Sequence, residues 1–165
     1  MPTAPLPPSQ YETLSDFQQS ARKRLADAYE LLEPPSRNRR RRTQHQDAAV
    51  YLAGYAVECA LKAYLIRQLE ARGISARNLV DVAWARGFNR KERQFCTHDL
   101  KGLCDAADLY ARMVLDPELR EDFGTCLKWS PEWRYKGRRI KTGVRPREFV
   151  DAMARVYRWI RDQAP

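Results

Sequence analysis

Four polar side chains recur at spacings of four, three and four residues in an otherwise apolar segment: Tyr51, Tyr55, Glu58 and Lys62. In a helix, these spacings put all four on one stripe. The stripe would carry two hydroxyls, a carboxylate and an ammonium, which together can hold a polar ligand or a partner. Glu58 and Lys62 also have the order that favours an i, i+4 ion pair, so a purely structural pair is the alternative interpretation.

A second candidate region combines basic and aromatic residues late in the chain. The segment RYKGRRIKTGVRPR, residues 134 to 147, holds seven basic residues in fourteen, and Trp129 and Trp133 precede it. Basic side chains interleaved with aromatic rings suit a phosphate backbone and its bases. The alternative is a solvated loop whose tryptophans fill the core beneath it.

The charge balance of the whole chain points to polyanions. Thirty Lys and Arg oppose 21 Asp and Glu, which gives a net charge of +9. Such an excess attracts RNA, DNA, nucleotides, anionic lipid or an acidic partner over a long range. Arginines that serve only solubility are the alternative explanation of the same totals.

The cysteines and histidines do not form a metal-binding pattern. No Cys-x-x-Cys pair occurs, and only two histidines are present. We therefore predict no metal and no cofactor, and we interpret the cysteines as reduced core residues. The residues concerned are Cys59, Cys96, Cys104, Cys126, His45 and His98.

The first half of the chain predicts two helices. Apolar residues at helical spacing indicate a helix over residues 13–33, which Pro34 and Pro35 would end. The five arginines within residues 37–42 predict a solvated connection. A second, long helix is expected from about residue 46 to 72, with Gly73 as its stop.

The second half predicts shorter helices. Residues 74–96 look irregular apart from a possible short helix over 79–85, and Thr97 can cap a helix that runs to about residue 114. Asp116 and Pro117 predict the start of another helix, to about residue 127. Pro146 opens the last helix, whose apolar residues are spaced four, three and four: Phe149, Met153, Val156 and Ile160.

These elements predict an all-α protein with one domain over residues 13–165. Residues 1–12 are rich in proline and are expected to form a disordered tail. No apolar signal core opens the chain, and residues 48–57 are too short a charge-free run to span a bilayer, so we expect a cytoplasmic protein without a membrane span.

Several segments, in their order and spacing, resemble the HEPN family (higher eukaryote and prokaryote nucleotide-binding). They are AVYLAGYAVECALKAYLI at 49–66, THDLKGLCDAADL at 97–109, WSPEWRY at 129–135 and a last helix containing RWI. The resemblance covers residues 13–163. It implies an up-and-down bundle of four to five helices that commonly dimerises and acts on RNA or nucleotides. Many relatives are metal-independent endoribonucleases in toxin-antitoxin or antiviral systems, and others are encoded beside a minimal nucleotidyltransferase.

Catalytic members of that family carry an Arg, four to six residues, and then a His. Arg93 and His98 fit this spacing, as do Arg39 or Arg40 with His45, a histidine that we expect to be exposed. The His would exchange protons with the ribose 2′-OH or the leaving 5′-oxygen while the Arg holds the phosphate. The family motif lies near the last helices, whereas His98 opens an earlier helix, where it could simply be structural.

The resemblance therefore leaves three hypotheses. The first is a non-catalytic module that binds RNA or a nucleotide, or partners a nucleotidyltransferase-type antitoxin. The second is a homodimeric endoribonuclease in which His98 is the acid or base, Arg93 or Arg134 holds the phosphate, and Glu58 orients one of them. The third is a helical protein-interaction domain. Arg134, which matches the family's Arg-Tyr pair, leads the candidate binding residues, which are Arg134, Tyr135, Lys62, Tyr55, Arg138 and Arg139.

Overall fold

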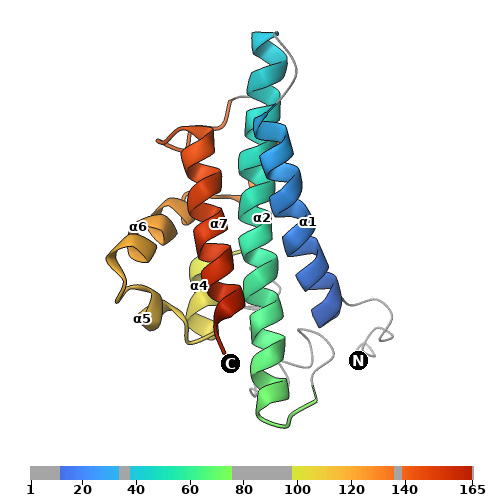
Figure 1. Ribbon diagram of the computed structural model, residues 1–165, viewed down its shortest axis with the longest axis vertical. Helices are drawn as coiled ribbons and strands as arrows, with labels where there is room; N and C mark the ends of the chain where they lie inside the picture. The colour runs from blue at the N-terminus through green and yellow to red at the C-terminus, as the bar shows by residue number, and fades with distance from the viewer. Residues whose placement is uncertain (1–11, 34–37, 76–97, 136–138, 165) are drawn as a thin grey trace, which may run out of the picture.

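The computed structural model describes residues 12–33, 38–75, 98–135 and 139–164. Its regular elements are all helices, which confirms the all-α prediction. Three long helices, α1 (Leu14–Leu32), α2 (Arg39–Ala71) and α7 (Pro146–Asp162), lie side by side (Figure 1). The short helices α4 (Leu100–Ala106), α5 (Tyr110–Met113) and α6 (Pro117–Cys126) pack beside them. The helix predicted over residues 79–85 lies outside the described residues, as does Thr97.

Helix α1 spans Leu14–Leu32 and begins where the sequence predicted. Thr13 and Asp16 form a capping box: the Thr13 hydroxyl accepts from the Asp16 backbone N–H, and the Asp16 carboxylate accepts from that of Thr13. Phe17, Ala21 and Ala28 are buried on one face, against α2. The predicted apolar face of this helix is therefore the face that forms the core.

Helix α2 spans Arg39–Ala71 and starts well before the residue 46 that we predicted. The arginine run was wrongly assigned to a connection, because Arg39–Arg42 form the first turn of the helix. Asn38 caps it by accepting the N–H groups of Arg40 and Arg41 at 2.9 and 3.3 Å. Arginine has a high helix propensity, and its charged head can stay in water while the backbone is helical. At the other end, Gly73 has a φ of 71°, as expected of the predicted stop.

Helices α4, Leu100–Ala106, and α5, Tyr110–Met113, replace the single helix that we predicted over residues 97–114. The chain breaks at Asp108, whose φ of 56° lies in the left-handed region. Asp99 caps α4 through its carboxylate, which accepts the N–H of Lys101 at 3.1 Å. Leu100, Leu103 and Cys104 of α4 are buried, as is Ala107, whereas Ala111 of α5, which its spacing also placed on the inward face, is exposed.

The remaining elements begin at prolines. Helix α6 spans Pro117–Cys126, the 3₁₀ helix η3 spans Pro131–Tyr135, and α7 spans Pro146–Asp162. Pro117 and Pro146 open α6 and α7, as predicted, since proline has no N–H that a first turn would leave unpaired. All four apolar residues predicted for α7 are buried there: Phe149, Met153, Val156 and Ile160.

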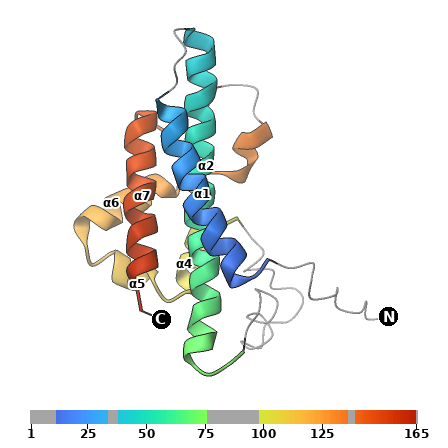
Figure 2. The ribbon, with the colours of Figure 1, turned by 45° about the vertical axis from the view of Figure 1, so that its right-hand side comes forward.

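Helix α2 is the centre of the bundle. It runs antiparallel to α1 and parallel to α7, and its N-terminal end projects beyond both (Figures 1 and 2). Small residues on α2 let the neighbouring helices approach closely, and all are buried: Ala49, Ala53, Ala56, Ala60 and Ala63. Within the described residues, α2 alone is long and apolar enough to cross a membrane, but 83% of its apolar window is buried inside the bundle. This burial is what the core helix of a helical bundle requires.

Three cysteines lie in the core. Cys59, Cys104 and Cys126 are free thiols and are buried, as we predicted for core residues. Burial raises the pKa of Cys59 and of Cys104 to about 12, so both stay protonated at neutral pH. Cys96 lies outside the described residues. The described residues contain no group of three or more His, Cys, Asp or Glu side chains that could hold a metal ion.

Candidate functional site

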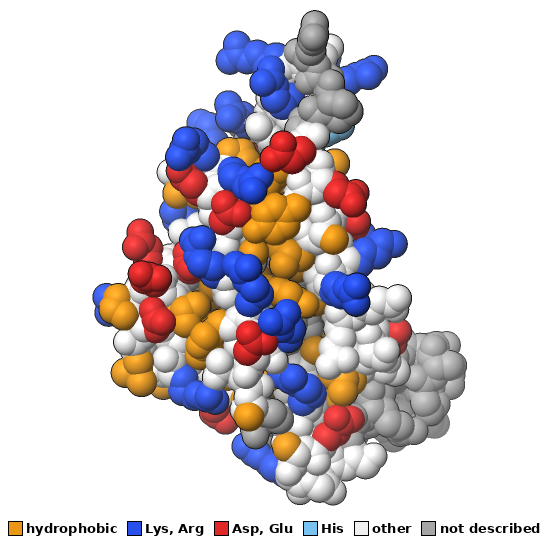
Figure 3. Space-filling model, viewed as in Figure 1, with side chains coloured by type: hydrophobic (Ala, Val, Ile, Leu, Met, Phe, Trp, Pro, Cys, Tyr) orange, Lys and Arg blue, Asp and Glu red, His pale blue; other side chains and the backbone are white. Residues whose placement is uncertain are grey.

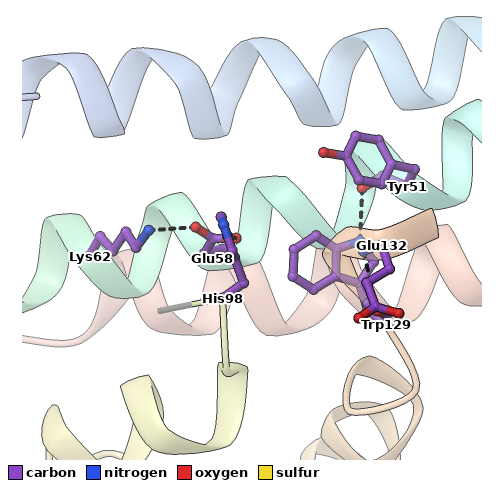
Figure 4. Close-up of polar contacts among 7 residues, drawn as sticks. Tyr51, Glu58, Lys62, His98, Trp129 and Glu132 are labelled. Carbon is purple, nitrogen blue, oxygen red and sulfur yellow. Dashed lines mark hydrogen bonds and ion pairs between the residues drawn. The ribbon is translucent and has the colours of Figure 1, made fainter. Parts of the chain in front are cut away.

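The polar stripe on α2 meets His98 at a buried carboxylate. Glu58 is 1% exposed, and its two oxygens have different partners: Lys62 Nζ lies 2.5 Å from Oε1, and His98 Nδ1 lies 2.9 Å from Oε2 (Figure 4). Lys62 itself is only 8% exposed. We call these three residues the Glu58 cluster. Its Glu58–Lys62 part is the i, i+4 pair that the sequence indicated, here inside the bundle and not on its surface.

The position of His98 depends on α4. His98 precedes the cap residue Asp99, and Leu103 of α4 is fully buried in the core. At the far end of this helix, Gln68 Nε2 of α2 donates to the carbonyl of Ala107 at 2.7 Å. The two contacts fix α4 along α2, with His98 beside Glu58 at one end and Ala107 beside Gln68 at the other.

The hydrogen bond to Glu58 determines which nitrogen of His98 is available. A carboxylate only accepts, so Nδ1 must donate, and Nε2 of the neutral ring keeps its lone pair. The His98 side chain is 42% exposed whereas Glu58 is buried. A histidine held by a buried carboxylate in this way can accept a proton at Nε2 and return it. The cluster therefore has the groups for acid–base chemistry, with Glu58 in a positioning role.

Tyr55 and Lys62 lie against α1. Arg24 of α1 lies over the Tyr55 ring at 5.9 Å, and Lys62 Nζ lies 5.8 Å from the centre of the Phe17 ring. The pKa of Tyr55 is raised to about 12, mainly by burial and to a smaller extent by the nearby Cys59 and Glu58. The Lys62 ammonium, a candidate phosphate ligand, is thus paired with Glu58 and lies over an aromatic ring.

Trp129 holds the segment before η3 against α2. Its indole N–H donates to the carbonyl of Tyr51 at 3.0 Å, and its ring lies on Gly54, where a Cβ would come within 2.1 Å of Trp129 Cδ1. Trp129 and Trp133 are 7% and 9% exposed, and the Trp133 ring packs on Phe149 at 5.9 Å. Both tryptophans are core residues, which is the alternative that the sequence left open.

The residues after Trp133 face outward. Arg134 and Tyr135 are both exposed, and the Arg134 guanidinium lies 4.8 Å from the centre of the Tyr135 ring. Further along, the N–H of Ile140 donates to Asp47 of α2 at 3.3 Å, which brings the exposed Arg139 close to the N-terminal part of α2. Burial raises the pKa of Asp47, and the Ile140 hydrogen bond and Arg139 oppose this shift.

Exposed cations gather around the projecting end of α2. We call this surface the basic end, and Figure 3 shows Lys and Arg side chains crowded there. Among the described residues, no ion pair joins any of its members to an acidic side chain, and the first turn of α2 contains no acidic residue. The residues of the basic end are Arg39, Arg40, Arg41, Arg42, Arg139 and Lys141.

The candidate residues thus fall into two separate regions. Glu58 follows Arg42 by sixteen positions on α2, which corresponds to about 24 Å along the helix axis. Glu58, Lys62 and His98 come together in one region, and Arg139 belongs to the other. Arg93 and Arg138 lie outside the described residues.

Some placements differ from what the sequence indicated. His45, which we expected to be exposed, is partly buried on α2, because the helix starts earlier than predicted and carries this residue along the bundle. The helical Arg39–Arg42 were not among our candidate binding residues, whereas Lys141 lies in the basic segment 134–147 that the sequence indicated. Asn38 was the available signal, since an Asn followed by good helix formers is a start signal that the charge run obscured.

No family model, curated protein or solved structure matches this chain. The resemblance to the HEPN family stays a prediction from the motifs.

Proposed function

We propose that this protein is a non-catalytic, cytoplasmic module of the HEPN kind that binds RNA or a nucleotide through its basic end. The observation that carries the proposal is the set of four exposed arginines on the first turn of α2, without an acidic partner among the described residues. The net charge of +9 supports the same class of ligand.

The arginines of α2 are in an electrostatically unfavourable place. A helix N-terminus carries the positive end of the helix dipole, and cations there are disfavoured, as are like charges on one turn. A polyanion that contacts this end relieves both repulsions. Binding is also favoured by the entropy of the counterions that leave the phosphates of the polyanion. Without a ligand, the repulsion among these arginines and with the helix dipole is unfavourable. We therefore infer that the ligand is anionic.

The wider setting follows from the HEPN resemblance alone. We propose a homodimer that works with a nucleotidyltransferase-type antitoxin in a toxin-antitoxin or defence system. Sedimentation of the purified chain tests the dimer, and co-purification from the native host with identification of the bound protein tests the partner. A monomer that purifies alone would remove this part of the proposal without touching RNA binding.

Salt dependence of RNA binding tests the central proposal. Anisotropy of a labelled single-stranded RNA is measured at several salt concentrations for the protein and for the variant Arg40→Glu/Arg41→Glu. Each lost phosphate contact should reduce the slope of log K against log salt by about 0.7. Arg120→Glu, an exposed charge on α6, serves as the matched control. An affinity that is absent, or that Arg120→Glu lowers as much per charge, would contradict the proposal.

A second candidate function is metal-independent cleavage of RNA, and the Glu58–His98 hydrogen bond specifically favours it. In this hypothesis, His98 Nε2 removes the proton of a ribose 2′-OH, and the resulting oxygen attacks the adjacent phosphorus. The bond to the 5′-oxygen breaks, and that oxygen takes up a proton, which leaves a 2′,3′-cyclic phosphate and a 5′-hydroxyl. Glu58 keeps Nδ1 protonated and the ring oriented.

Incubation of labelled RNA with the protein in EDTA separates the two candidates. Cleavage that His98→Ala abolishes and that Glu58→Gln reduces would support the endoribonuclease. The variant His45→Ala is the control, because His45 is the other histidine with the Arg spacing. Binding without cleavage would support the non-catalytic module, and cleavage that persists in His98→Ala would refute the role of His98.

A further inference from the structure

Tyr135 is an aromatic side chain that the bundle holds out into solvent. It is 78% exposed, whereas the two tryptophans of the same segment are buried. Exposure of so much of an aromatic ring forgoes the apolar burial that usually stabilises it. The ring is not isolated, since Arg134 lies 4.8 Å from its centre.

The arrangement of Arg134 and Tyr135 leaves the ring available for stacking. The guanidinium covers part of the ring, and a base can approach the rest of it. Aromatic side chains in such positions stack on bases of single strands, and a neighbouring arginine adds cation–π attraction. The backbone beneath is held firmly, because Trp129 is hydrogen-bonded to Tyr51 and Trp133 packs on Phe149.

The same side of the molecule offers phosphate contacts within reach. The Ile140–Asp47 hydrogen bond sets Arg139 beside α2 near Asp47, and Asp47 lies about 8 Å along the helix axis from Arg42. A strand that stacks on Tyr135 can therefore continue over Arg139 toward the arginines of the basic end. Figure 2 shows η3 on the opposite side of α2 from α5, so this path does not cross the short helices.

We propose that Tyr135 stacks on an unpaired base, so that the ligand of the basic end is single-stranded RNA and not a duplex. The inference rests on the proposed function. In a duplex the base faces are already stacked inside the helix, and Tyr135 could then meet only sugars and phosphates. A single strand offers both its phosphates and the faces of its bases to this surface.

Binding of single-stranded and duplex RNA to the full chain and to Tyr135→Ala tests the proposal. The substitution should weaken binding of the single strand about 5- to 150-fold, the factor that corresponds to loss of one stacked base. Binding of the duplex should change little. Tyr135→Trp should retain the affinity, and Leu115→Ala, which also removes an exposed apolar side chain, should leave both affinities unchanged.

A stacking signal keeps this test separate from the charge test. The fluorescence of 2-aminopurine within the single strand should fall on binding to the protein and to Tyr135→Trp, but not on binding to Tyr135→Ala at saturation. Salt-dependent binding with an equal effect of Tyr135→Ala on both ligands, or with none, would overturn the stacking proposal alone. Absence of salt-dependent binding to either RNA would overturn the proposed function with it.

Discussion

The contact between Gly54 and Trp129 yields a stability prediction with a clear sign. In the interior of a helix, Gly→Ala normally stabilises by about 1 kcal/mol. Here the added Cβ would lie 2.1 Å from Trp129 Cδ1 and 2.3 Å from Nε1, and these atoms belong to a rigid, buried ring. Gly54→Ala should therefore destabilise the protein, because the ring has to leave its position.

The magnitude follows from what the ring loses. Complete removal of a buried tryptophan costs about 3–5 kcal/mol. Subtraction of the helix-propensity gain leaves about 2–4 kcal/mol of destabilisation for Gly54→Ala. For a chain of this size that corresponds to a fall in Tm of roughly 4–16 °C. Because Trp129 holds the segment that carries Arg134, RNA affinity should fall as well.

Thermal and urea unfolding of the parent and four variants tests the argument. Gly124→Ala in α6 is the matched control, since nothing lies within 4 Å of its added Cβ, and it should stabilise by up to about 1 kcal/mol. In a Trp129→Ala background, Gly54→Ala should cost little or should stabilise. A Gly54→Ala protein as stable as the parent, or a penalty that persists without the indole ring, would refute the reasoning.

Three further predictions concern buried or partly buried side chains. Glu58→Leu should lower the free energy of unfolding in urea by about 3–5 kcal/mol, because it leaves the buried Lys62 ammonium unpaired. The double variant with Lys62→Met should recover part of the lost stability. A double variant as unstable as the single one would contradict the ion-pair account. Burial raises the pKa of Asp47 in the folded protein above its ordinary value of 3.8. The protonated carboxyl therefore stabilises the fold below pH 3.8, and this stabilisation is lost as the pH rises through the folded-state pKa. The Tm of Asp47→Asn minus the Tm of the parent should therefore increase as the pH rises through that range. A Tm difference that does not change with pH would contradict the raised pKa. Cys59 and Cys104 should resist iodoacetamide at neutral pH until the protein unfolds, as peptide mapping would detect, and rapid labelling of the native chain would exclude a pKa near 12.

The parts of the fold that the sequence predicted depend on local signals. Pro117 and Pro146 fix helix starts through their missing N–H, and Gly73 ends α2 through its positive φ. The break at Asp108 had no such signal, because a non-glycine residue in the left-handed region is chosen by the packing around it. Helix α2 starts earlier than predicted because the helix propensity of arginine and the Asn38 cap outweigh the repulsion within the charged run.

The candidate site could be predicted only in part. The spacing of Glu58 and Lys62 indicated their pair, since both lie on one helix. The contact between Glu58 and His98 joins residues 40 apart in the sequence, and no local rule specifies it. The basic end likewise depends on tertiary structure, because the Ile140–Asp47 hydrogen bond is what brings Arg139 toward the arginines of α2.

The central place of α2 has a consequence during synthesis. Its partner α1 is its neighbour in the chain, but α7, which covers another face, begins at Pro146, about 75 residues after α2 ends. At translation rates of about 5–20 residues per second, that face stays uncovered for about 4–15 s. A nascent chain with this delay is a substrate for chaperones that bind apolar helices, and a chain stopped after Ile74 should bind the dye ANS where the full chain does not. The cellular yield of the protein would then be limited by the delay between the synthesis of α2 and the synthesis of α7.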